Sequence, residues 1–154
     1  MRIAVGSDHR GVEMRMKLIE MLGSLGQHVV DVGTYDGENV DYPDVGASVA
    51  RKVSSGEVDR GILICGTGLG MCIAANKIAG VRAAPCHDEL TAEMSRRHND
   101  LNVLCLSGDV LAEKVAERLV DIWLTTDFDG GRHARRLEKI AEFENENGNG
   151  NGKA

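Results

Sequence analysis

The feature of this sequence that most constrains its fold is a regular alternation of short apolar runs with longer amphipathic stretches. Most of the apolar runs are rich in Val, Ile and Leu without polar alternation, which is typical of parallel strands buried on both faces. These runs cover residues 3–6, 29–32, 61–65, 81–85 and 103–106. Helices are expected at residues 11–25, 44–54, 68–78, 89–98, 110–124 and 132–143. The pattern predicts an α/β fold in three layers, with a five-stranded parallel sheet flanked by helices.

The length of the chain fits one domain. It has 154 residues, of which 42% are hydrophobic, enough to build a single core. We expect this domain to span residues 1–144. Residues 145–154 are mostly Asn and Gly and have nothing to bury, so we expect them to form a disordered tail.

The net charge argues against some classes of partner. A formal charge of −6 and an isoelectric point near 5.3 disfavour nucleic acid, which binds basic surfaces. A local basic cluster can still bind a small anion. No apolar stretch approaches the roughly 18 residues of a membrane span, and the start of the chain lacks the pattern of a secretory signal. We expect a cytoplasmic protein with no nucleic-acid or membrane partner.

The four cysteines do not form a metal-binding pattern. They are Cys65, Cys72, Cys86 and Cys105. None belongs to a Cys-x-x-Cys pair, and no Cys/His spacing matches a structural zinc motif. We therefore expect free, buried thiols and no metal site.

The loop after the third predicted strand is the most informative place to look for a site, because ligands of open parallel sheets bind beyond the carboxyl ends of the strands. Its alternating glycines allow backbone N–H groups to approach an anion closely. The loop is not a P-loop, since no Gly-Lys-Ser/Thr follows it. It matches a dinucleotide-binding turn poorly, because Met71 stands where a third glycine is needed, although a nucleotide remains an alternative. The loop consists of Cys65, Gly66, Thr67, Gly68, Leu69 and Gly70.

Several polar residues near this and other strand ends admit two interpretations each. Cys65 is either a packed strand-end residue or a thiolate base at a helix start. Thr67 either donates a hydrogen bond to a ligand or caps the helix, and Asp8 is either a site residue or a helix cap. His98 either takes part in catalysis or interacts with the carbonyls at a helix end.

One dense basic cluster lies near the end of the chain, after Gly130 and Gly131. Arg132 and Arg136 are four residues apart and share a face of the predicted helix. The cluster is either a solvated basic face or a phosphate site, because guanidinium groups match the geometry of phosphate. Its members are Arg132, His133, Arg135 and Arg136.

Together, these motifs resemble one family, ribose-5-phosphate isomerase B with its galactose-6-phosphate isomerase relatives. The resemblance extends from Met1 to about Glu144 and rests on the joint order and spacing of several short segments. These segments are residues 6–9, 41–43, 64–70, 73–77, 95–100 and 130–133.

The family resemblance implies a Rossmann-like fold and a homodimer, or a tetramer, with active sites at the subunit interface. It implies interconversion of D-ribose 5-phosphate and D-ribulose 5-phosphate through an enediolate, without a metal or other cofactor. Two alternatives stay open. The chain could isomerise another aldose phosphate, a hexose or a tetrose, or it could be a noncatalytic module that binds a sugar phosphate or a nucleotide.

The resemblance also implies catalytic roles. Cys65 matches the base that moves a proton between C1 and C2, and Thr67 matches its hydrogen-bonding helper. His98 matches the acid/base that opens the furanose ring, with Asp8 and Tyr42 in support.

The substrate-binding residues implied by the resemblance fall into two sets. One set stabilises the enediolate and consists of Gly66, Gly68, Leu69, Gly70 and Asn99. The other binds the phosphate, in part from the partner subunit, and consists of His9, Arg132, His133 and Arg136.

Asp109 departs from the family pattern. Many family members carry an arginine at the corresponding position, and this arginine helps to bind the phosphate or sugar end of the substrate. A carboxylate facing a phosphate weakens its binding. Asp109 could instead cap the next helix, with Arg135 compensating. We expect a changed substrate preference or a lower affinity, with the isomerase chemistry retained.

The variant Asp109→Arg tests this expectation. Returning a cation to this position should lower the KM for ribose 5-phosphate, by about tenfold for one charge-assisted hydrogen bond. Steady-state kinetics on ribose 5-phosphate measures the effect, and an unchanged KM would contradict the expectation.

Overall fold

The computed structural model describes residues 1–34 and 38–150 and contains one five-stranded sheet. All neighbouring strands pair in parallel, in the order β2-β1-β3-β5-β4. The strands are β1 (Arg2–Ser7), β2 (His28–Asp31), β3 (Arg60–Cys65), β4 (Ala83–Pro85) and β5 (Val103–Ser107). The predicted α/β fold with a parallel sheet is therefore confirmed, and the carboxyl ends of all five strands lie at one edge.

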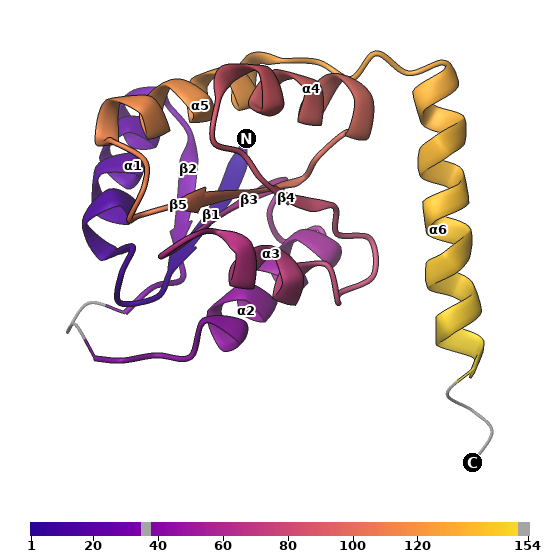
Figure 1. Cartoon of the computed structure of the whole chain (residues 1–154), viewed down its shortest axis with the longest axis horizontal. Helices are drawn as coiled ribbons and strands as arrows, with labels where there is room; N and C mark the ends of the chain where they lie inside the picture. Colours follow the sequence, from indigo (N-terminus) through magenta and orange to yellow (C-terminus); the bar gives the residue numbers. More distant parts are fainter. Residues whose placement is uncertain (35–37, 151–154) are drawn as a thin grey trace.

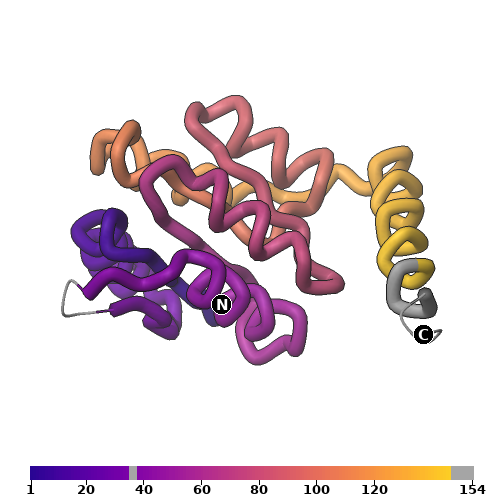
Figure 2. Tube along the Cα trace, turned by 60° about the horizontal axis from the view of Figure 1, so that its bottom comes forward, coloured from indigo at the N-terminus to yellow at the C-terminus, as the bar shows by residue number. Residues whose placement is uncertain are grey.

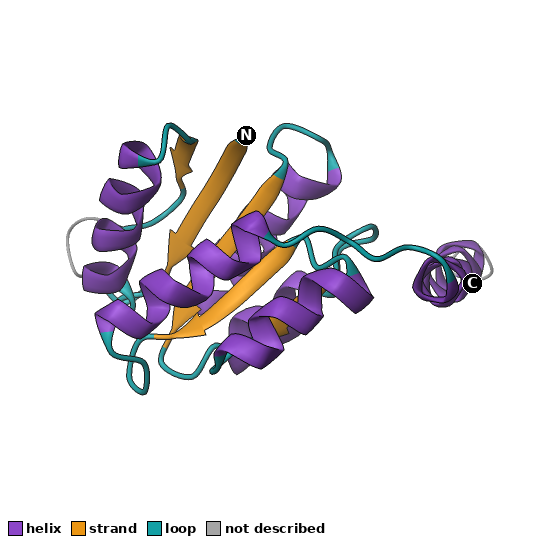
Figure 3. Cartoon of the chain, turned by 90° about the horizontal axis from the view of Figure 1, so that it is seen from above, coloured by secondary structure: helices purple, strands orange, loops and turns teal. Residues whose placement is uncertain are grey.

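Helices cover both faces of the sheet and make three layers (Figure 1 and Figure 3). One face carries α1 (Val12–Ser24), α4 (Glu89–Asn99) and α5 (Glu113–Thr125), and the other carries α2 (Tyr42–Ser54) and α3 (Leu69–Ala75). Each face has its own apolar cluster, because the strand side chains alternate between the two sides. Leu18, Leu119 and Trp123 are fully or almost fully buried in the first cluster, and Val49 and Met71 in the second.

The last helix, α6 (Arg132–Gly150), stands apart from the three layers (Figure 1 and Figure 2). It extends to Gly150 and so includes residues 145–150 of the segment for which the sequence predicts a disordered tail. A helix that has formed extends readily, because each added residue gains a hydrogen bond. Residues 151–154 of the predicted tail lie outside the described residues. Neither α6 nor any other described helix is long and apolar enough to cross a membrane.

Two helix boundaries differ from the sequence prediction because side chains bind the backbone there. α3 ends at Ala75, since the next residue, Asn76, pairs with the edge strand: its Nδ2 donates to the Ala83 carbonyl at 2.8 Å and its Oδ1 accepts from the Ala83 N–H at 2.9 Å. α5 begins only at Glu113. The segment before it forms a turn in which the Val110 N–H donates to Ser107 Oγ at 3.1 Å.

The paired hydrogen bonds of Asn76 generate a stability prediction. Asn76→Ala should lower the free energy of unfolding by about 2 kcal/mol, because it removes two hydrogen bonds and leaves both backbone groups of Ala83 without these partners. Urea unfolding at one fixed protein concentration measures the change. The neighbouring exposed residue gives the control, and Lys77→Ala should stay within about 0.5 kcal/mol of the wild type. Equal stability of the two variants would contradict the prediction.

Candidate active site

The predicted glycine loop lies at the carboxyl edge of the sheet, directly after β3. Cys65 is the last residue of β3 and is 5% exposed. Its Sγ accepts a hydrogen bond from the Gly68 N–H at 3.2 Å. Gly68 has a φ of 79°, in the left-handed region that favours glycine, and a Cβ there would lie 3.2 Å from the Leu106 backbone. The loop conformation thus directs a backbone N–H group at the Cys65 sulfur.

The loop after β5 fixes the backbone of Cys65 and Gly66. The Cys65 carbonyl accepts a hydrogen bond from the Gly108 N–H at 2.8 Å. The Gly66 carbonyl accepts two, from Ser107 Oγ at 2.6 Å and from the Asp109 N–H at 3.1 Å. Because both carbonyls are held, the N–H groups on the opposite side of these peptides have fixed directions, as donors that stabilise a developing oxyanion require.

Tyr42 covers the far end of the glycine loop. It is the first residue of α2, and a Cβ on Gly70 would lie only 2.7 Å from its ring. Glycine at position 70 therefore allows the ring to approach the loop backbone. Within the glycine loop, the Thr67 hydroxyl accepts a hydrogen bond from the Leu69 N–H at 3.3 Å. The side chains of Thr67 and Leu69 are both exposed.

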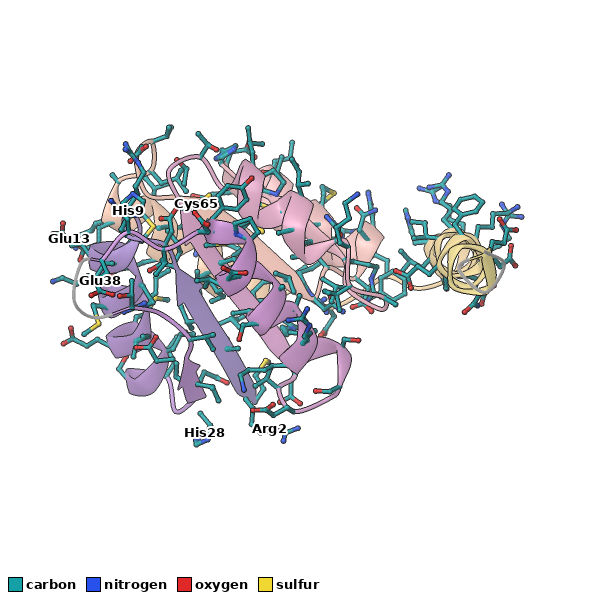
Figure 4. All side chains as sticks on the ribbon, turned by 90° about the horizontal axis from the view of Figure 1, so that it is seen from below. Arg2, His9, Glu13, His28, Glu38 and Cys65 are labelled. Atoms are coloured by element: carbon teal, nitrogen blue, oxygen red, sulfur yellow. The ribbon has the colours of Figure 1, made fainter. Side chains whose placement is uncertain are left out.

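Asp8 and His9 follow β1 at the same edge. Asp8 is buried, and its Oδ1 accepts a hydrogen bond from the Arg10 N–H at 2.9 Å. The residue that caps α1 is Gly11, so Asp8 is not the helix cap. His9 is exposed and lies beside Cys65, whereas Arg2 and His28 lie at the opposite edge (Figure 4).

Asp109 is paired with a cation that we did not predict as a site residue. Arg10 donates to it from Nε at 3.0 Å and from Nη2 at 2.6 Å. This hydrogen-bonded carboxylate raises the pKa of Arg10. Asp109 does not cap α5, whose cap is Ala112, and Arg10 rather than Arg135 compensates its charge. The prediction that Asp109 caps the next helix with Arg135 compensating is therefore wrong.

A second group of predicted residues gathers where α4 meets α6. The rings of His98 and His133 stack with their centroids 4.2 Å apart and their planes 6° from parallel. Burial and the neighbouring His98, Arg132 and Arg136 lower the pKa of His133. Arg132 Nε donates to His133 Nε2 at 3.4 Å, which fits a neutral ring that accepts a hydrogen bond.

The remaining predicted residues surround this pair of histidines. Asn99 ends α4 next to His98, and Arg132 and Arg136 lie on the first turns of α6 with exposed side chains. The environment is basic, so it suits an anion.

One set of side chains in this region has the composition of a metal site. Potential ligand atoms of His98, Asp129 and His133 lie within 4.8 Å of one another. The nitrogen lone pairs of two stacked, nearly parallel rings lie in two separate parallel planes, so one ring would have to tilt before both could point at a single ion. Asp129 is also already bound by Arg97 Nε, at 3.2 Å to each oxygen. The cluster therefore fits an anion or a proton-transfer role better than a metal.

The structure places the two groups of predicted residues at opposite edges of the sheet within one chain. Cys65 lies at the carboxyl edge, while α4 runs antiparallel to the strands and carries His98 to the amino edge. There Arg82, just before β4, donates from Nε to the carbonyls of Asn99 and Asp100 at 3.1 and 3.0 Å. α4 has 11 residues and spans about 16 Å, longer than a pentose phosphate. A single chain does not bring Cys65 and His98 together.

Several residues that contact the predicted groups were missed from the sequence, and three of them carry side chains of interest. Ser107 and Arg10 contact the glycine loop or its neighbours, and Asp129 lies beside the histidines. Arg10 could have been predicted from the sequence, because it follows Asp8 and His9 at the end of β1 and its charge complements that of Asp109. Ser107 and Asp129 carry no comparable signal, since both types are common in loops.

Comparison with known proteins identifies the family. A family model described as Ribose/Galactose Isomerase matches residues 3–140. Ribose-5-phosphate isomerase B of Escherichia coli is 46% identical over 143 residues, which cover 93% of this chain and 96% of that protein. D-erythrulose-4-phosphate isomerase of Pectobacterium atrosepticum is 40% identical over 146 residues, 94% of this chain and 95% of that protein.

A solved structure shows the same fold with a ligand. Ribose-5-phosphate isomerase B of Mycoplasma genitalium, crystallised with bound ribulose-5-phosphate, is 44% identical and superposes with a TM-score of 0.90. The match covers 94% of this chain and 97% of that chain. The family model and the near-complete coverage of these relatives lead to one conclusion: the chain belongs to the Ribose/Galactose Isomerase family and is an isomerase.

Proposed function

We propose that this isomerase interconverts D-ribose 5-phosphate and D-ribulose 5-phosphate in the cytoplasm, with Cys65 as the base. The observation that carries the proposal is the position of the Cys65 sulfur, at the end of β3 beside a backbone whose carbonyls are held by the loop after β5. The E. coli and M. genitalium relatives, whose names give this activity, support the choice of substrate.

The chemistry follows from this position. In the open-chain aldose, the Cys65 thiolate removes the proton on C2, and the electron pair moves onto the carbonyl oxygen at C1 to form an enediolate. The N–H groups of residues 66–70 stabilise the charge on oxygen. Cys65 then delivers a proton to C1, and the C2 hydroxyl passes its proton to the C1 oxygen as the C2 ketone and the C1 hydroxyl form. Atoms and electrons balance in this scheme without a metal or other cofactor, and the Thr67 hydroxyl supplies a further hydrogen bond to the reacting oxygens.

Ring opening belongs to the second group of residues. His98 accepts the proton of the C1 hydroxyl and a proton is returned to the ring oxygen, with Asp8 and Tyr42 at the carboxyl edge in support. Arg132, His133 and Arg136 offer a basic surface for the phosphate.

Because one chain separates Cys65 from His98, we infer that two copies form a homodimer with shared sites. In a dimer with twofold symmetry, the carboxyl edge of each copy can face the α4–α6 region of the other copy, so the dimer contains two equivalent sites. α6 supports this inference. Its Ile140 and Phe143 are 44% and 58% exposed, beside a groove of about 520 Å³ that also contains Val81 and Leu101. A second copy would cover this apolar surface.

The P. atrosepticum relative, named for a tetrose phosphate, supports a second candidate within the same reaction class. The description of the family model, Ribose/Galactose Isomerase, supports a hexose phosphate as a third candidate at the level of the family. The alternative of a noncatalytic sugar-phosphate or nucleotide module has no comparable observation in its favour. A panel of tetrose, pentose and hexose phosphates ranks the substrates by kcat/KM, and the largest value for a pentose phosphate is the expected result.

Replacing the proposed base tests the mechanism. Cys65→Ala should lower kcat for ribose 5-phosphate by about 10²–10⁴, because the proton acceptor is lost, while binding of ribose 5-phosphate measured by calorimetry persists. Exchange of solvent deuterium into C1 and C2, followed by NMR, should fall in parallel.

Cys72 provides the matched control. It is half-buried, whereas the other three cysteines are buried, and the Cys105 thiol and Asn76 lower its pKa to about 7. Cys72→Ala should keep kcat within about threefold of the wild type. If Cys72→Ala is inactive and Cys65→Ala is active, the assignment of the base is wrong.

Mixing two inactive variants tests the shared site. Cys65→Ala and His98→Ala should each be inactive as homodimers, because every site lacks one group. After unfolding and refolding of an equal mixture, about a quarter of the wild-type activity should return, since half of the dimers are mixed and each contains one intact site. A mixture that stays inactive, although chromatography shows mixed dimers, would contradict the shared site.

A further inference from the structure

The pair formed by Arg10 and Asp109 links two loops at the carboxyl edge. Arg10 belongs to the loop after β1 and Asp109 to the loop after β5, 99 residues later. Arg10 Nε lies 3.2 and 3.0 Å from the two carboxylate oxygens, and Nη2 lies 2.6 Å from one of them. This two-point contact fixes the plane of the guanidinium group as well as its position.

The pair lies directly on the backbone of Gly66. A Cβ built on Gly66 would lie 2.8 Å from Asp109 Oδ2 and 3.1 Å from Arg10 Nε. A side chain at position 66 would therefore displace the pair from this place. The guanidinium group is therefore held against the residue that follows Cys65.

Arg10 remains available to a ligand despite this contact. Its side chain is 56% exposed, and a guanidinium group has five N–H donors, of which the pair uses those on Nε and Nη2. Among the residues that the structure describes, Nη1 has no hydrogen-bond partner. A pocket of about 220 Å³ lies beside Arg10, between α1 and the loop after β5.

We propose that Arg10 is a substrate-binding residue that binds the phosphate group, and that Asp109 is a positioning residue that holds Arg10 against Gly66. The proposal rests on the proposed isomerase function. The cation that binds the phosphate at the carboxyl edge then comes from the loop after β1. The family resemblance leads us to expect this cation in the loop after β5.

The charges explain why Asp109 does not repel the substrate. As long as Arg10 covers both oxygens, the pair is neutral and its outer surface presents N–H donors. Without Arg10, the same carboxylate faces the ligand uncovered, in a region that also contains buried Asp8, which contacts Arg10, and exposed Glu13, which lines the same pocket as Arg10. Loss of Arg10 thus replaces a donor by an acidic surface.

The test compares three variants with ribose 5-phosphate. Arg10→Ala should raise KM on the order of 10- to 100-fold with kcat within about threefold of the wild type. Arg10→Ala combined with Asp109→Asn should bind better than Arg10→Ala alone, because the uncovered charge is gone. Arg10→Ala combined with Asp109→Arg should return KM to within about threefold of the wild type. The reason is that the side chains at positions 10 and 109 both lie against Gly66, so an arginine at either position can place its guanidinium group there.

The second readout is the inhibition constant of inorganic phosphate, which should follow the same order as KM. An equally exposed ion pair at the other edge supplies the control. Arg2 and Asp59 pair at 3.6 Å, far from Cys65 (Figure 4), and Arg2→Ala should leave KM unchanged. Thermal melts of all variants identify any that are unfolded at the assay temperature.

Two results would overturn the proposal. One is a KM of Arg10→Ala equal to that of the wild type. The other is a lowered melting temperature for Arg10→Ala with the same KM in all three variants, which would give the pair a structural role only. Neither result affects the proposed function, which fails only if the wild-type protein does not isomerise ribose 5-phosphate.

Discussion

The hydrogen bonds from the loop after β5 to the carbonyls of Cys65 and Gly66 are the interaction on which the carboxyl edge depends. They exist because β3 and β5 are parallel neighbours and end together, Cys65 opposite Ser107. Ser107, Gly108 and Asp109 then each donate one hydrogen bond to the end of β3. The glycine loop, the sulfur that it faces and the ion pair above Gly66 all take their positions from this arrangement.

The fold could be predicted from the sequence because its signal is repeated. Five apolar runs and the helices between them specify one parallel sheet, whose strands all end at the carboxyl edge. Because ligand sites of such sheets lie at that edge, the sequence correctly predicted that Asp8, Cys65 and Asp109 lie on the same side of the sheet. Element boundaries were less predictable. Side chains such as Asn76 end a helix by binding a strand that follows several residues later, and local periodicity contains no information about such contacts.

The composition of the site was predictable in part only. His98 and Cys65 belong to one predicted list, yet their separation depends on the direction in which α4 crosses the sheet. Arg10 was missed because a single arginine after a strand is usually solvated, and only the three-dimensional proximity of Asp109 gives it a fixed position. The family resemblance supplied roles for residues but not the partners that this chain uses to orient them.

The absence of space above Gly66 has a consequence for how this sequence could have arisen. Two loops 99 residues apart now depend on each other's charge, so the order of substitutions matters. If the anion at position 109 had come first, the edge would have carried an uncovered carboxylate beside the residue that follows Cys65. Acquiring Arg10 first adds a cation and only afterwards permits Asp109. The ion pair therefore makes one historical path accessible, and it makes the present pair difficult to reverse one residue at a time.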